Sequence, residues 1–437
     1  MPAGLLALEY PMPNEPGVTD SLLLRAKWMS TPQQHPLVMA FGRWLAPRYL
    51  SFPLGVRELR ISAEDTAKLT ALRGERVVLT PNHPTFDPVV MFALSTKLGM
   101  AFCYLSAREL FNNPLSAFVI SRVGAYAVER GVRDDSALHT SRQLIAEGRH
   151  WLVLFPEGEA HYLHDLVLPF LPGAASLGLG ALSDLAAAGQ PLPPVYLVPL
   201  ALRYHYLADM RREMLASLAR LERRLGLPQP SPPLGWLARL GRIADHVLEY
   251  NEEALGLVPP DQHDLQARLD CLRELVLSRT AGALGIEVPP ANLPLRNRLR
   301  KILVGAKRIS HTPPKRGGAY AWQLYRRRRA HTRLLQRELQ RVLDFLALTG
   351  TYSYDVPTVE NYLDVLGRLE LEVLGRQHFR GPRAVTVRVG EPLDLRRYYE
   401  LYQHSPEQAS EQAISEVERA VRALLAETAS LMTPLPA

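Results

Sequence analysis

The strongest constraint on the fold is a regular alternation of two kinds of segment between residues 51 and 206. Short runs rich in β-branched and aromatic residues predict strands, and the stretches between them predict helices. The predicted strands are VRELRI (56–61), RVVLT (76–80), MAFCYLS (100–106), AYAVE (125–129), WLVLF (151–155) and VYLVPLAL (195–202). The predicted helices cover 88–98, 107–122, 135–147 and 173–188. Because such alternation is typical of a sheet covered by helices, we expect an α/β domain.

A long helical stretch interrupts this pattern after residue 206. Six further helices are predicted, and then PRAVTVRVGEPLDL (382–395) alternates with period two, as strands do. A strand that returns after so many helices indicates an insertion into the α/β domain. We therefore predict four parts, namely an N-terminal segment (1–50), the α/β domain (51–206 plus 383–400), a helical insertion (207–382) and a C-terminal helix (405–432).

Positive charge is concentrated in the predicted insertion. Between Arg296 and Arg341 there are 15 Lys or Arg residues and one acidic residue, Glu338, whereas the whole chain has a net charge of only +7. The rest of the chain is therefore net negative. A local patch of this kind predicts an anionic partner, either a lipid surface or a nucleic acid.

Cysteine content and hydropathy bear on location. Cys103 and Cys271 are the two cysteines, so a disulfide framework is excluded, and a reducing cytoplasm is the simplest compartment. The first 30 residues lack the charged and apolar regions of a secretory signal, and no uninterrupted run of 18 apolar residues occurs. We therefore expect a cytoplasmic protein, associated at most with the surface of a membrane.

The most informative segment is PNHPTFDP (81–88), which lies between a predicted strand and a predicted helix. His83 stands at the carboxyl end of the strand, where α/β sheets commonly bind ligands. Asp87 can bond one imidazole nitrogen and leave the other as a general base. A second interpretation, that Asn82, Thr85 and Asp87 only form a turn and a helix cap, fits the segment equally well.

Three more blocks follow in order at the ends of later strands. They are GAYAVERG (124–131), FPEGEAHYLHD (155–165) and LVPLALRY (197–204). Together with the first block, they resemble the glycerol-phosphate and lysophospholipid acyltransferase family. PFLPGAASLGLG (169–180) and VRVGEPLDL (387–395) stand where that family has two smaller motifs. The resemblance covers about 51–206 plus 383–395, and it implies a mixed sheet flanked by helices.

The resemblance implies roles for individual residues. His83 would take a proton from an acceptor hydroxyl, and Asp87 would orient it. Arg130 and Glu157 would hold the acceptor, and backbone amides around Gly158 would stabilise the oxyanion. Asn82 and Arg203, in the matching blocks, are further candidates for substrate binding. No cofactor is expected.

Two departures from the family pattern affect this site. His83 and Asp87 are separated by three residues where the family usually has four, and Pro88 takes the place of the acid. Glu159 and Ala160 follow Gly158, where the family commonly has a polar residue and an arginine. The first departure puts the geometry of the dyad in doubt, and the second removes a cation that would bind an acceptor phosphate.

Other functions remain open from the sequence. His161, His164 and Asp165 form a cluster that could hold a metal in a hydrolase, although such spacing in a loop is usually only polar surface. The run Arg326 to Arg329 could bind nucleic acid, but no recognised nucleic-acid motif surrounds it. A non-catalytic lipid-binding or nucleic-acid-binding relative is the third possibility.

The leading hypothesis is an O-acyltransferase in membrane lipid synthesis or remodelling. It would move a fatty acyl group from acyl-CoA or acyl carrier protein to the hydroxyl of a lysolipid or glycerol-type acceptor. Its basic segment 296–341 would bind the anionic cytoplasmic face of a membrane. A metal is not required, and nucleic acid is the less favoured partner.

Overall fold

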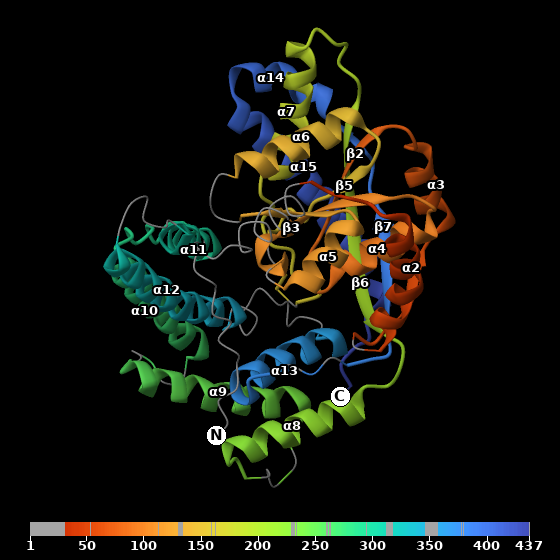
Figure 1. Cartoon of the computed structure of the whole chain (residues 1–437). Coiled ribbons are helices and arrows are strands. Elements are labelled where there is room, and N and C mark those ends of the chain that lie inside the picture. Colours follow the sequence, from red (N-terminus) through yellow and green to blue (C-terminus); the bar gives the residue numbers. More distant parts are fainter. Residues whose placement is uncertain are drawn as a thin grey trace.

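The computed structural model describes most of the chain. The described part runs from 31 to 436, leaving out 53, 112, 130–133, 159, 162, 229–231, 233, 259–260, 262–263, 294, 312–317, 346–356, 377 and 379. Figure 1 shows a twisted sheet with helices on both sides and, below and beside it, a separate group of helices.

The sheet has the strand order β1-β7-β6-β2-β5-β3-β4, and the short β8 pairs with β6. Neighbouring strands from β6 to β4 are parallel, whereas β7 is antiparallel to β6 and parallel to β1. The sheet is therefore mixed, as predicted. The strands are β1 (Val56–Ile61), β2 (Arg76–Pro81), β3 (Phe102–Ala107), β4 (Ala125–Val128), β5 (Trp151–Val153), β6 (Val195–Tyr206), β7 (Arg383–Val389) and β8 (Leu393–Asp394).

Two apolar cores cover the two faces of the sheet. Val77 and Leu79 of β2 point into the first core, and Val78 between them points into the second, as the alternation of a strand requires. The helices on the first face are α2 (Pro36–Ser51), α3 (Ala63–Ala71), α4 (Asp87–Lys97) and α5 (Pro114–Arg122); those on the second are α6 (Asp135–Glu147), α7 (Gly173–Ala187) and α15 (Pro406–Glu427). Burial on both faces explains the apolar character of the central strands.

One predicted helix divides in two. The stretch 107–122 begins as the short 3-10 helix η1 (Arg108–Phe111) and continues as α5. The side chain of Asn113 accepts hydrogen bonds from the amides of Leu115 and Ser116, and Pro114 is the first residue of α5. An asparagine cap followed by proline starts a new helix, because the cap satisfies the free amides and proline needs no amide partner there.

The helical stretch 207–382 leaves the α/β domain and returns to it. After this stretch β7 enters the sheet between β1 and β6, with Leu202 opposite Val387. The chain thus completes one sheet with strands from both sides of the helical segment. The division of the chain into the four predicted parts remains a prediction.

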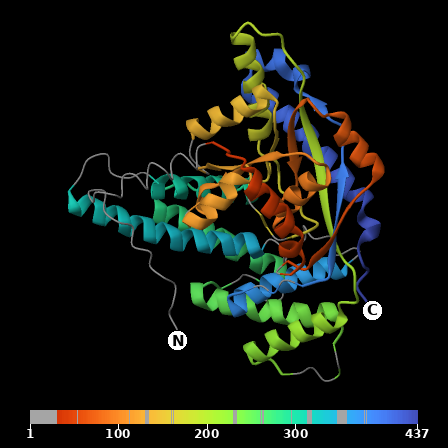
Figure 2. The same cartoon turned by 45° about the vertical axis from the view of Figure 1, so that its right-hand side comes forward.

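The helices of this segment, which we call the helical block, surround a core of their own. It is built from apolar faces such as Leu218 and Leu221 of α8, Ile243 of α9 and Leu366 of α13. The helices are α8 (Arg211–Leu225), α9 (Trp236–Leu255), α10 (Leu265–Leu284), α11 (Leu295–His311), α12 (Ala319–Phe345) and α13 (Val359–Leu374). In Figure 2 the green to cyan helices of this block project to one side of the sheet.

The position of α13 links the helical block to the sheet. Its buried Glu360 accepts hydrogen bonds from the amide of Tyr206, at 3.1 Å, and from that of Thr433, at 3.0 Å. The first amide lies at the end of β6 and the second follows the last helical turn of the chain. In the described part of the chain, no helix is both long enough and apolar enough to cross a membrane.

Candidate active site

The residues of the first and third sequence blocks meet at one edge of the sheet. Strands β2 and β5 are parallel neighbours, so the segments that follow them leave the same edge. His83 follows β2 and Glu157 follows β5. The backbone amide of His83 donates to Glu157 Oε1 at 2.6 Å, which ties the two segments together.

His83 and Asp87 form a dyad despite their shortened spacing. His83 Nδ1 lies 2.8 Å from Asp87 Oδ2. Because a carboxylate accepts, Nδ1 carries the proton in this pair, and in the neutral imidazole Nε2 then keeps its lone pair. Within the described part of the chain no hydrogen bond to Nε2 is formed, and 15% of the His83 side chain is exposed. The imidazole is therefore oriented as a base with an accessible nitrogen.

The carboxylate of Asp87 is buried and surrounded by donors. Besides His83, the amide of Thr85 donates to Oδ2 at 2.8 Å, and the hydroxyl of Tyr204 donates to Oδ1 at 2.6 Å. Asp87 is also the first residue of α4, where the helix dipole favours negative charge. These contacts fix the carboxylate in one position beside His83.

Tyr204 is the third member of this arrangement. It lies near the end of β6 and is almost completely buried. Burial raises the pKa of Tyr204 well above its usual value, and the charge of Asp87 and their hydrogen bond raise it further. The hydroxyl therefore stays protonated and can only donate to Asp87.

Glu157 is fully engaged with the protein. Its Oε1 accepts from the amide of His83, while Oε2 accepts from the amide of Leu168 at 2.5 Å and from His161 Nε2 at 2.9 Å. The side chain is completely buried. This arrangement positions His83 and the loop after β5, so the predicted role of Glu157 in holding an acceptor has no support in its contacts.

The loop after β5 also shapes the site. The ring of Phe155 stacks on that of His83, with 4.1 Å between the ring centres. Gly158 has a φ of +80°, and its amide donates to the carbonyl of Phe155 at 3.0 Å. A side chain at position 158 would be strained by this φ and would collide with Leu171. The Gly158 amide thus closes a turn, and the prediction that backbone amides around Gly158 stabilise the oxyanion stays a prediction.

Asn82 and Arg203, both predicted to bind substrate, make contacts within the protein. Asn82 is fully buried and exchanges two hydrogen bonds with the backbone of Leu202, joining β2 to β6. Arg203 lies on the opposite face of β6 from Leu202 and Tyr204. Its guanidinium pairs with Asp165 and donates to the carbonyl of Leu425 at 2.6 Å. The roles predicted for both residues in substrate binding therefore stay predictions without support from these contacts.

The cluster His161, His164 and Asp165 does not converge on one point. His161 bonds Glu157, whereas His164 Nδ1 lies 2.6 Å from Asp364 Oδ1 and Asp165 pairs with Arg203. Among the described residues there is no group of three His, Cys, Asp or Glu side chains that could hold a metal ion. The geometry of these side chains therefore disfavours the metal-hydrolase alternative.

Arg130 and Glu159 lie outside the described residues. The role predicted for Arg130 in binding the acceptor therefore stays a prediction.

Sequence reasoning missed three residues around this site. Tyr204 holds Asp87, Asp364 bonds His164, and Arg368 donates to the carbonyl of His161. Tyr204 had a signal in the sequence. It is a polar aromatic residue in the block LVPLALRY (197–204), two residues beyond Leu202 and so on the same face of a buried strand. Asp364 and Arg368 carry no such signal, because they lie about 200 residues further along the chain.

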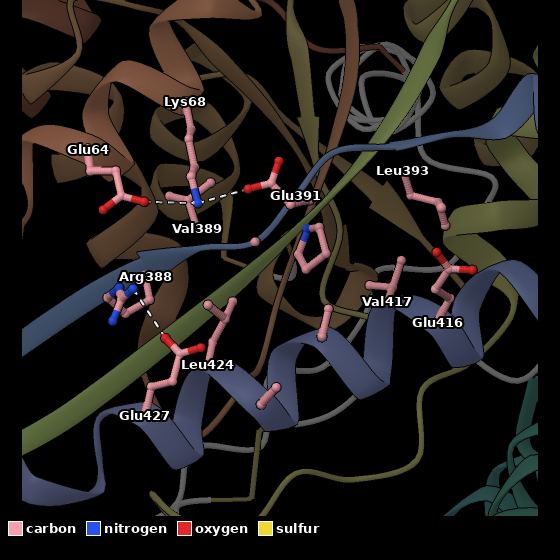
Figure 3. Close-up of a pocket in the computed structure, with 14 residues that line it drawn as sticks. Glu64, Lys68, Arg388, Val389, Glu391, Leu393, Glu416, Val417, Leu424 and Glu427 are labelled. Atoms are coloured by element: carbon pink, nitrogen blue, oxygen red, sulfur yellow. Dashed lines mark ion pairs between the residues drawn. The ribbon is translucent and has the colours of Figure 1, made fainter.

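A separate cavity of about 410 Å³ lies between α3, α15 and the connection from β7 to β8. Lys68 pairs with Glu64 and Glu391 at its rim, and Arg388 pairs with Glu427, as Figure 3 shows. None of its lining residues belongs to the His83 site. Its charged groups are paired with one another, except for Glu416, which pairs with Arg397 outside the lining.

Comparison with known proteins identifies the domain. A search of curated proteins finds no match. Residues 60–203 match the Acyltransferase family, a span that includes the His83 dyad, Glu157 and Arg203. The order of the four sequence blocks, the mixed sheet and this match agree. The chain therefore carries a domain of the Acyltransferase family and is an acyltransferase.

Proposed function

We propose that this acyltransferase moves a fatty acyl group from a thioester, acyl-CoA or acyl carrier protein, to the hydroxyl of a lysolipid or glycerol-type acceptor. The observation that carries the proposal is the His83 imidazole, whose Nδ1 is 2.8 Å from Asp87 and whose Nε2 has no partner within the described residues. An imidazole in this state is suited to take a proton from a hydroxyl.

The proposed reaction proceeds in two steps. In the first, His83 Nε2 takes the proton of the acceptor hydroxyl while its oxygen attacks the thioester carbonyl, forming a C–O bond and a tetrahedral oxyanion. In the second, the oxyanion collapses, the C–S bond breaks, and the imidazolium returns the proton to the leaving thiolate. Asp87 stabilises the transient imidazolium through its bond to Nδ1. The products are an ester and a free thiol, and no cofactor takes part.

We further propose that the preferred acceptor has no phosphate dianion exposed at its headgroup. Ala160 stands where the family pattern commonly has an arginine, and Arg203 is occupied by Asp165 and the carboxyl-terminal segment. One cation of the family pattern is therefore absent, and a second is engaged within the protein. A lysolipid with a zwitterionic or sugar headgroup avoids this loss, because it does not leave a buried charge without a partner.

An acceptor panel tests both proposals. Lipids that co-purify with the protein are identified, and their lyso forms are compared with lysophosphatidic acid and glycerol 3-phosphate, with thiol release from acyl-CoA as the readout. We expect thiol release with a zwitterionic or sugar lysolipid and a lower kcat/KM with the two phosphate acceptors. If glycerol 3-phosphate or lysophosphatidic acid has the highest kcat/KM, the headgroup proposal is wrong. Absence of thiol release with every acceptor and both donor types would contradict the function itself.

We also propose that the protein works on the cytoplasmic face of a membrane and that the basic helices bind its anionic surface. The exposed side chains on α12 include Arg326, Arg327 and Arg328, with Tyr320 and Trp322 one to two turns before them. Cations beside aromatic side chains suit a lipid interface, where both kinds of group find favourable surroundings. Arg298 of α11 differs, because it is buried and pairs with Glu274. The same face could bind nucleic acid, which the vesicle experiment described below distinguishes.

A further inference from the structure

A continuous series of contacts runs from the helical block to the catalytic dyad. Asp364 of α13 bonds His164, the ring of His164 packs against Tyr204, and Tyr204 bonds Asp87. Asp87 in turn bonds His83. The first residue of this series, Asp364, and the last, His83, are separated in the sequence by most of the α/β domain and most of the helical block.

The link between Tyr204 and Asp87 is the strongest. The hydroxyl lies 2.6 Å from Asp87 Oδ1, and both side chains are removed from solvent. Asp87 Oδ2 is already shared by His83 and the amide of Thr85. Without the Tyr204 hydroxyl, Oδ1 would lose this hydrogen bond in a site that water does not reach, and the carboxylate could rotate away from His83.

The ring of His164 is held in one orientation against Tyr204. Its centre lies 5.0 Å from that of Tyr204. Asp364 accepts twice, from the His164 amide at 2.8 Å and at Oδ1 from Nδ1 at 2.6 Å. Arg383, the first residue of β7, donates to His164 Nε2 at 3.1 Å and lies over the Tyr204 ring. Because a guanidinium only donates, Nε2 accepts from Arg383 and Nδ1 donates to Asp364.

The same helix also holds the loop that positions Glu157. Arg368, one turn after Asp364 on α13, donates to the backbone carbonyl of His161. His161 bonds Glu157, which accepts from the amide of His83. Two residues of α13 thus act on both supports of His83, one through Asp87 and one through Glu157.

We propose that the helical block is part of the catalytic apparatus, with Tyr204 as the positioning residue that holds Asp87 and with Asp364 fixing His164 against Tyr204. This inference deepens the proposed function and rests on it. It explains why an acyltransferase domain keeps an inserted helical segment in contact with the loop beside its dyad. Neither residue contacts the reacting atoms, so each acts through Asp87.

Substitution of Tyr204 tests the first link. Tyr204→Phe keeps the buried ring and removes the hydroxyl, and we expect kcat/KM to fall about tenfold. In an Asp87→Asn background the same substitution should change kcat/KM less than about twofold, because the carboxylate through which Tyr204 acts has already been replaced. Tyr126→Phe is the matched control, since it removes a buried hydroxyl bond of 2.7 Å, to Ser141, elsewhere in the sheet. It should lower the unfolding temperature similarly and leave kcat/KM unchanged.

The double substitution separates a catalytic from a structural effect. If Tyr204→Phe lowers kcat/KM by the same factor with and without Asp87→Asn, Tyr204 does not act through Asp87 and the proposal is overturned. Full activity of the single variant overturns it as well.

Substitution of Asp364 tests the second link. Asp364→Asn should lower kcat/KM about threefold, and the loss should shrink in the Tyr204→Phe background. Glu360→Gln is the matched control, because Glu360 lies one turn earlier on α13 and joins it to the sheet without contacting His164. If the two variants lose stability equally and activity equally, the contribution of the helical block through His164 is refuted.

Failure of this inference can be told apart from failure of the proposed function. If the wild-type protein releases thiol in the presence of an acceptor and His83→Ala does not, the proposed function stands. Additive effects of Tyr204→Phe and Asp87→Asn then count against the positioning series alone.

Discussion

Glu157 Oε1 accepts a hydrogen bond from the backbone amide of His83 at 2.6 Å, so the segment that follows β5 holds the segment that follows β2. The bond acts on the main chain of the proposed base and leaves its imidazole to Asp87. A carboxylate in this position stabilises the segment that carries His83 without competing for its proton.

Glu157→Gln should lower both stability and activity. The amide nitrogen of glutamine cannot accept from Leu168 and His161, so we expect a loss of about 1 to 3 kcal/mol in unfolding free energy and a lower kcat. Glu418→Gln is the matched control, because Glu418 accepts from the amide of Phe170 in the same loop, on the side of α15. The unfolding free energy from chemical denaturation and kcat from steady-state kinetics are measured for both variants. A Glu157 variant no worse in kcat than the Glu418 variant would contradict a positioning role.

His83→Ala should abolish most of the acyl transfer and leave the fold intact. A general base contributes about 10² to 10⁴-fold in rate, and the side chain lies at the edge of the sheet. Asp87→Asn should reduce kcat/KM less. His139→Ala, on the exposed face of α6, is the control. Wild-type turnover by the His83 variant, with donor and acceptor saturating, would exclude the proposed base.

Arg203→Leu should destabilise the protein without changing KM. The substitution leaves Asp165 without its cation and removes the bond to the carbonyl of Leu425, which we expect to cost about 3 kcal/mol. Arg396→Leu, which breaks an exposed pair with Asp394, should cost less than about 1 kcal/mol. Denaturation and acceptor titrations at low temperature provide the measurement. If Arg203→Leu instead raises KM for the acceptor strongly, the result would support the role in substrate binding that the sequence predicted for Arg203.

Neutralising part of α12 should weaken binding to anionic vesicles. Each Lys or Arg close to such a surface contributes about 1 kcal/mol at low salt, so Arg326→Gln, Arg327→Gln and Arg328→Gln together should cost about 3 kcal/mol. The control changes three exposed arginines of α8, Arg211, Arg212 and Arg224, in the same way.

Co-sedimentation with vesicles of rising anionic lipid content, at two salt concentrations, measures this effect. Equal binding of the α8 and α12 variants would show that the charge acts non-specifically. Binding to RNA that is tighter than binding to vesicles would favour the nucleic-acid alternative.

The stability of the sheet should depend on pH through His205. Burial and the nearby positive charge of Arg60 lower the pKa of His205 from its usual value of 6.5. The unfolded chain therefore binds a proton more readily than the folded one, so stability is complete above pH 6.5 and falls as the pH drops toward the folded value. Unfolding free energy measured from pH 7.5 to 5 should show a smaller slope in His205→Gln than in wild type. The exposed His139→Gln should leave the slope unchanged, and an unaltered slope in His205→Gln would contradict this assignment.

The elements of the α/β domain could be predicted from local sequence because their signals are local. Hydrophobic period and composition revealed β1 to β7, but they did not separate the short β8 from β7 and did not predict α3. The return of an alternating segment at 382–395 indicated that β7 belongs to the same domain as β6. The position of His83 and Asp87 between a strand and a helix was likewise visible. Their contact at 2.8 Å was not, because the spacing differs from the family pattern and only the folded turn before α4 brings the atoms together.

The faces of β6 illustrate what the sequence left open. Alternation along a strand means that Arg203 and Tyr204 point to opposite sides, but it does not say which side carries His83. That choice follows from the pairing of β2 with β6 and from the helices that cover each face. The arginine, which is the more conspicuous residue, faces α15 and the tyrosine faces Asp87.

The sequence alone determined the fold class and the placement of His83 and Asp87 between a strand and a helix, because each depends on residues close together in the chain. Tertiary structure decided that Asn82 and Arg203 support the sheet, that Glu157 holds the backbone of His83, and that Asp364 reaches the loop beside the dyad. The physical reason is that a buried polar group must find a partner wherever the fold places one, and those partners lie between about 70 and 220 residues away in sequence.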